Sequence, residues 1–208
     1  MKPVSYIGVF FLLACVACME NRDPEGLKEV LNADQKIVID SVEVLKETLE
    51  LNQLEGRWYY KGKPYSGYAL KLHANDTLGE KLGFHNGKRE GLAQQWSENG
   101  VLRIESYYSN NKLDKFYRTW WENGVLASVV IYENGQKQGM EKQWYPDGTL
   151  AKQRMLVEGK ESGLQKAWLP NGVLYVNYEA LNGRIFGMRR ANSCYQLEDE
   201  KIIQNDEL

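Results

Sequence analysis

The chain has 208 residues and a formal net charge of −2, with 26 basic against 28 acidic side chains. This balance gives no strong field toward nucleic acid or an anionic surface, and it argues against both as partners of the folded part. The high aromatic content, with 6 Trp and 13 Tyr, favours strands over helices.

Residues 1–18, MKPVSYIGVFFLLACVAC, predict an export signal. A lysine precedes an apolar run from Val4 to Leu13, which is shorter than the roughly 20 apolar residues needed to cross a bilayer. A short run that ends at small residues is typical of a cleaved secretory signal.

Two cysteines at the end of this signal indicate a lipid anchor. The stretch Leu12-Leu13-Ala14-Cys15 resembles the lipobox of bacterial lipoproteins, in which cleavage exposes a cysteine that receives a diacylglycerol. Small residues also precede Cys18, and polar and acidic residues follow it at once. We therefore favour Cys18 as the lipidated residue, with Cys15 as the alternative and a plain secretory signal as a third interpretation. Lipidation would hold the chain at a membrane surface without making it integral.

Residues 19–55 are predicted to form a polar tether followed by a short irregular or helical segment. Residues 19–35 are polar, and Lys36–Ile39 has the composition of a short strand that one or two helical turns could follow. The body of the chain then holds only Cys194, so an internal disulfide is impossible there, and we expect an inert core cysteine.

Residues 56–191 contain an internal repeat. Four similar phrases, WSENGVL, WWENGVL, WYPDGTL and WLPNGVL, follow one another at intervals of 24 residues. They begin at Trp96, Trp120, Trp144 and Trp168. Glycine recurs on the same beat before each phrase, with Lys115 as the one exception, and a weakened unit opens the array at Gly56. Several columns in one register indicate a repeat array.

Each unit is predicted to be a β-hairpin. Asn-Gly or Asp-Gly pairs such as Asn86-Gly87 and Asn99-Gly100 lie about a dozen residues apart, and such pairs accept the positive φ of tight hairpin turns. The fold class predicted for residues 56–191 is therefore all-β: an elongated antiparallel β-meander of 24-residue hairpins in a single twisted sheet. Residues 192–208 are predicted to hold the end of the last strand and an acidic tail.

Alternation along the strands predicts two faces. One face is expected to carry the four tryptophans, with Leu92, Phe116, Met140 and Leu164 on the first strands. Leu102, Leu126, Leu150 and Leu174 are expected to join them from the second strands, together with Tyr108, Tyr132 and Leu156. The other face is the candidate partner-binding surface, because an apolar patch there is typical of partner sites. Its predicted members are Tyr107, Tyr117, Trp121, Ile131, Tyr145, Met155, Leu169 and Tyr175.

The sequence offers little for catalysis. Its two histidines, His73 and His85, have no accompanying cluster of cysteines or carboxylates of the kind that binds metal. The common nucleophile, metalloprotease and phosphate-loop motifs are absent from the sequence. We therefore expect a protein that is not an enzyme and that uses neither a metal nor another cofactor.

The repeat resembles the MORN-repeat family, in the bacterial variant often labelled a YwqK-type antitoxin component. The shared pattern is Gly-x-x-x-x-Trp/Tyr-x-x-Asn-Gly-x-Leu, which is seen at Gly91–Leu102, Gly139–Leu150 and Gly163–Leu174. The resemblance implies an antiparallel platform for proteins or lipid surfaces. Together with the lipobox it is similar to lipoproteins of Bacteroidetes-like bacteria, which favours the outer membrane.

The expected function is that of a protein-binding or scaffolding module anchored by lipid at the cell envelope, with another envelope protein as partner. Two alternatives remain open at this stage: an antitoxin-like neutralising protein, and a purely structural envelope spacer that needs no exposed apolar patch.

Overall fold

The computed structural model describes residues 37–188. The predicted signal, the tether up to Lys36 and the tail from residue 192 lie outside the described residues, and so do all three cysteines. Within residues 37–188 nearly all regular structure is β, and no helix there is long and apolar enough to cross a membrane.

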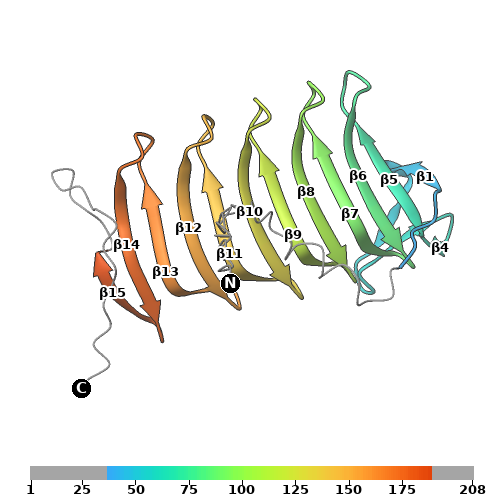
Figure 1. The fold of residues 1–208 in the computed structure, drawn as a ribbon. Helices are drawn as coiled ribbons and strands as arrows, with labels where there is room; N and C mark the ends of the chain where they lie inside the picture. Colours follow the sequence, from blue (N-terminus) through green and yellow to red (C-terminus); the bar gives the residue numbers. More distant parts are fainter. Residues whose placement is uncertain (1–36, 189–208) are drawn as a thin grey trace, which may run out of the picture. The chain divides into compact units, whose positions relative to one another are not determined.

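Twelve strands of the described range form one open sheet, in which consecutive strands are neighbours from β5 to β15 (Figure 1). All its pairs are antiparallel except β1 with β5, which is parallel. Its strands are β1 (Glu43–Leu45), β5 (Gly67–Leu72), β6 (Leu78–His85), β7 (Lys88–Trp96), β8 (Leu102–Ser109), β9 (Lys112–Trp120), β10 (Leu126–Glu133), β11 (Gln136–Trp144), β12 (Leu150–Val157), β13 (Lys160–Trp168), β14 (Leu174–Leu181) and β15 (Arg184–Met188). The predicted antiparallel meander of hairpins is confirmed.

The start of the array differs from the prediction. Residues 56–67 do contain a hairpin, but it belongs to a separate small sheet of β2 (Glu50–Asn52), β3 (Arg57–Tyr60) and β4 (Lys63–Pro64). The predicted strand at Lys36–Ile39 was wrong for its described part, since the first strand is β1, and a single 3₁₀ turn at Lys46–Thr48 follows it. The repeating hairpins therefore begin at Gly67.

This N-terminal segment covers one end of the sheet with a small core. Phe84 is fully buried there and makes ring contacts with Trp58 and Tyr65, at centroid distances of 6.0 and 5.9 Å. Burial raises the pKa of Tyr65 to about 12, and its hydroxyl lies 2.9 Å from the carbonyl oxygen of Tyr68. Leu49, Ala69, Leu82 and Ala93 complete the buried cluster. A terminal unit that differs from its neighbours and covers apolar surface is expected of a repeat array.

Hydrogen bonds at the two-residue turns join each hairpin to the preceding one. The second turn residue donates its backbone N–H to a carbonyl 22 residues earlier: Gly87 to Tyr65 (2.7 Å), Asn111 to Arg89 (3.0 Å), Gly135 to Leu113 (2.8 Å) and Gly159 to Lys137 (2.8 Å). Asn111 replaces the expected glycine and still adopts a φ of 70°. The same contact thus recurs at four successive turns, whichever residue holds the position.

The first strand of each unit contains a residue in the left-handed region. Gly91, Gly139 and Gly163 have φ of 74°, 76° and 78°, and Lys115 adopts 62° at the beat where glycine is missing. The pairing register shifts beside each of them, which identifies them as bulges. The repeat geometry is therefore maintained at Lys115 at the cost of a conformation that non-glycine residues disfavour.

We predict that Gly139→Ala destabilises the chain by about 1–2 kcal/mol, because a Cβ added there meets no atom and only the left-handed backbone opposes it. Lys115→Ala is the matched control. Its backbone strain is already present, so it should lose only the contact with Tyr107, about 0.5–1 kcal/mol. Urea unfolding followed by tryptophan fluorescence measures both, and an unchanged midpoint for Gly139→Ala would contradict the account.

Candidate partner-binding face

A second bulge in each hairpin decides which side chains share a face. Gln95 pairs with Ile104 but Trp96 pairs with Leu102, so Arg103 is an extra residue in β8. Ala127, Ala151 and Tyr175 are the extra residues in the following units. Because side chains alternate with a period of two, one extra residue moves the rest of the strand to the other face.

The pairing defines a face that carries the four tryptophans, which we call the tryptophan face. Each of these tryptophans pairs with the leucine of its own phrase, as in Trp96 with Leu102 and Trp120 with Leu126. All four are half-buried rather than buried. Truncation of a fully buried tryptophan to alanine costs about 3–5 kcal/mol of stability. We expect a smaller loss for each of these four, because they are only half-buried.

A row of apolar side chains crosses the tryptophan face at right angles to the strands. Leu92 pairs with Tyr107, and Met140 pairs with Met155. Phe116 pairs with Ile131, and its ring centroid lies 6.4 Å from that of Tyr107. We call the following set the apolar row: Leu92, Tyr107, Phe116, Ile131, Met140, Met155, Leu164 and Phe186. Every member is exposed or half-buried, so the row faces outward across the repeats.

Charged groups lie beside the apolar row near its β7–β9 end. Lys115 Nζ lies 4.5 Å from the ring centroid of Tyr107, and the Arg118 guanidinium lies 4.5 Å from that of Phe116. Arg118 also forms an ion pair with Glu105 (3.3 Å) on the neighbouring strand. Burial raises the pKa of the Tyr107 hydroxyl, and Glu90 and Asp114 add to the shift, so this tyrosine stays neutral at physiological pH. An apolar strip with a charged margin is the usual composition of a protein-binding surface.

The opposite face is packed more tightly. Val130 and Leu156 are 3% and 2% exposed, although within residues 37–188 no second layer of strands covers the repeats there. Glu141 is also buried on this face and accepts hydrogen bonds from Lys137 and Arg154. Burial alone would raise the pKa of Glu141, but these two cations lower it overall, which keeps the carboxylate charged. Closely packed side chains with satisfied charges indicate a structural role for this face.

The structure does not bring the eight predicted binding residues together. Tyr107, Ile131 and Met155 lie on the tryptophan face, whereas Tyr117 pairs with Ser106 and Val130 on the opposite face. The predicted shared surface was therefore wrong, and so was the placement of Tyr108, Tyr132 and Leu156 with the tryptophans, since these three lie on the opposite face. Leu92, Phe116, Met140 and Leu164 do lie on the tryptophan face, as predicted, and they form half of the apolar row. The bulge at Gly91 and its equivalents is marked in the sequence by the recurring glycine, but no residue type marks the bulge at Arg103.

Four of the predicted residues lie at the edge or the bulge of the sheet. Trp121, Tyr145 and Leu169 begin the five-residue turns that follow the first strand of each unit, and Tyr175 is a bulge residue. Trp121 Nε1 donates a hydrogen bond to the carbonyl oxygen of Trp144 (3.0 Å), and the Tyr145 hydroxyl donates to that of Trp168 (2.9 Å). These two side chains therefore join successive repeats.

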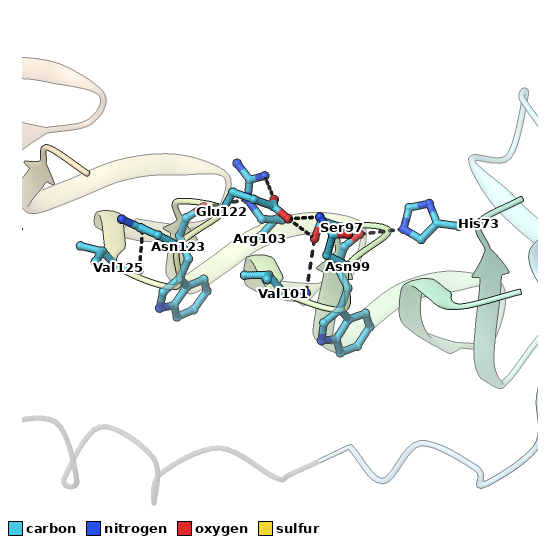
Figure 2. Close-up of polar contacts among 10 residues, drawn as sticks. His73, Ser97, Asn99, Val101, Arg103, Glu122, Asn123 and Val125 are labelled. Carbon is cyan, nitrogen blue, oxygen red and sulfur yellow. Dashed lines mark hydrogen bonds and ion pairs between the residues drawn. The ribbon is translucent and has the colours of Figure 1, made fainter. Parts of the chain in front are cut away.

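The turn edge continues this pattern toward the start of the array (Figure 2). His73 Nε2 donates to the carbonyl oxygen of Trp96 (2.9 Å), because a carbonyl can only accept. Ser97 and Asn99 both donate to Oε1 of Glu122, at 2.8 and 2.9 Å, and Arg103 forms an ion pair with Oε2 (2.6 Å). Polar side chains at this edge thus bond one repeat to the next.

The described residues contain no group of three or more His, Cys, Asp or Glu that could hold a metal ion. His73 is engaged in the turn contact, and His85 is exposed at the end of β6.

Comparison with known proteins supports the MORN-repeat resemblance. Residues 89–112, which cover β7 from its second residue, β8 and the turns that follow these two strands, match the MORN repeat variant. MORN repeats are generally associated with protein or membrane binding. No curated protein matches the chain.

The turn edge predicts a pH dependence. Hydrogen bonds from Asn99 and Ser97, with the ion pair to Arg103, hold the pKa of Glu122 below its ordinary value. A carboxyl whose folded pKa is lowered stabilises the fold above its unfolded pKa of about 4.3, and this contribution is lost as the pH falls through the lowered folded value.

Glu122→Gln should therefore reduce the loss of stability between about pH 5 and pH 3, relative to the unchanged chain. Thermal unfolding across that range measures the difference, and Glu98→Gln, at the same position of the preceding phrase, is the control. Identical pH profiles for Glu122→Gln and the unchanged chain would contradict the assigned role of Glu122.

Proposed function

We propose that this chain is a non-catalytic, lipid-anchored binding module of the bacterial cell envelope. In this proposal the apolar row on the tryptophan face binds another protein molecule of the envelope, and the anchor at Cys18 holds the module at the outer membrane. The observation that carries the proposal is the row itself: eight apolar side chains from eight strands, all at least partly exposed, in one line.

The energetics of the sheet favour a binding role for the row. Apolar side chains that face water on a single-layer sheet contribute less to folding than buried ones, but removing them from water in a complex gains about 25 cal/mol per Å². Large exposed apolar patches on folded proteins commonly mark such interaction sites. The association of MORN repeats with protein or membrane binding supports the same function.

A protein partner is favoured over a lipid surface for the repeats themselves. The side chains beside the row include both signs of charge, such as Glu105 with Arg118, rather than the basic cluster that binds anionic lipid. Membrane attachment is therefore assigned to the lipid anchor and partner capture to the row.

A photo-crosslinking residue tests the binding surface. Benzoylphenylalanine in place of Phe116 should give a discrete protein adduct in native membranes, whereas the same residue in place of Gln143 should give none. Gln143 is the matched control because it is half-buried on the opposite face of the same array.

The outcomes separate the candidate functions. A structural spacer gives no adduct from either position, and adduct formation by Gln143 alone would move the binding surface to the opposite face. An antitoxin-like protein gives an adduct with a cytoplasmic toxin instead of an envelope protein.

Lipidation has its own test. We predict that Cys18→Ser abolishes incorporation of labelled palmitate and releases the protein from membranes, because the acyl chains are then absent. Cys15→Ser is the control and should keep both properties. Loss of the label only in Cys15→Ser would transfer the anchor to that cysteine, and retention of the label in both variants would contradict a cysteine-linked anchor at either position.

A further inference from the structure

The apolar row is nearly symmetric about its middle strand. The eight residues of the row lie on every strand from β7 to β15 except β14. At the equivalent position of β14 lies Glu179, which pairs with Leu164 on one side and Phe186 on the other, so the line has nine positions in all. Met140, on β11, is the fifth of these nine positions. Since neighbouring strands lie about 4.8 Å apart, the row spans about 38 Å.

Two unpaired charges lie at equivalent distances from this middle. Glu179 is the second position from the β15 end and forms no ion pair within residues 37–188. Lys115 Nζ lies over Tyr107, the second position from the β7 end, and also forms no ion pair in that range. One end of the row therefore presents a carboxylate and the other an ammonium, and neither is in an ion pair within residues 37–188.

Lys115 is unusual for a second reason. It holds a left-handed backbone, with φ of 62°, at the one beat where the array lacks glycine. At this position the lysine side chain supplies a positive charge and a contact with the Tyr107 ring, which glycine would not.

We propose that the occupant of the apolar row is a second copy of this chain. The proposal rests on the proposed function of the row and names its partner. The two tryptophan faces pack against each other about a two-fold axis that lies in the interface and runs along β11. Met140 then meets Met140, Leu164 meets Phe116, and Phe186 meets Leu92. Glu179 of each copy faces Lys115 of the other, so the dimer contains two Glu179–Lys115 ion pairs.

Charge selects this axis over its alternative. A two-fold axis along the row itself would place Glu179 against Glu179 and Lys115 against Lys115, and like charges that face each other disfavour an interface. Self-pairing is also consistent with symmetry, because a two-fold interface needs a patch that is complementary to itself.

Charge exchange tests the register. Sedimentation of the purified, lipidated chain in detergent should show a dimer. Glu179→Lys and Lys115→Glu should each weaken it at least about tenfold, and the two changes together should restore it to within about threefold. Lys115→Gly removes the charge and at the same time suits the left-handed backbone. It should therefore weaken the dimer while leaving the fold intact.

Crosslinking tests which face pairs, in a chain with Cys194→Ser. Met140→Cys should form a disulfide-linked dimer on mild oxidation, whereas Gln143→Cys on the opposite face should not. A chain that stays monomeric at high concentration, or single charge changes without effect, would overturn the proposal. If the Phe116 photo-adduct then contains a different envelope protein, the binding function stands and the self-pairing fails; if no adduct forms at all, both fail.

Discussion

Backbone pairing of successive hairpins, with two bulges at fixed places in every unit, is the constraint on which the rest of the structure depends. The bulge at Gly91 and its equivalents bends the first strand, and the bulge at Arg103 and its equivalents moves part of the second strand to the other face. Because both recur at intervals of 24 residues, the same types of side chain line up across all units. The half-buried tryptophans, the outward apolar row and the tightly packed opposite face all follow from this register.

The repeated part of the fold could be predicted from the sequence, but its faces could not. Evenly spaced Asn-Gly turns are sufficient to predict hairpins, since few other folds accept them at this spacing. The faces predicted from strict alternation of side chains were wrong beyond Arg103, because the bulge there needs no glycine and leaves no mark in the sequence. Tyr117 and Ile131 were therefore assigned to one surface although they lie on two. The N-terminal cap was missed in part because it does not repeat.

The edges of the sheet show how the single layer formed by residues 67–188 is held together. Turn residues such as Trp121 and Glu122 bond to the neighbouring repeat at one edge, and the backbone of the two-residue turns does so at the other. Buried, paired charges such as Glu141 with Arg154 keep the opposite face closed. Stability is thus distributed between neighbouring units, which leaves the tryptophan face available for a partner.

Carbene footprinting of the protein in its own membranes tests the central claim most directly, because it measures which side chains a partner removes from water. The account predicts that Phe116, Ile131 and Met140 are labelled less in membranes than in the isolated monomer, while Tyr117 and Gln143 are labelled equally in both. Protection of Tyr117 with unchanged labelling of the apolar row would contradict it.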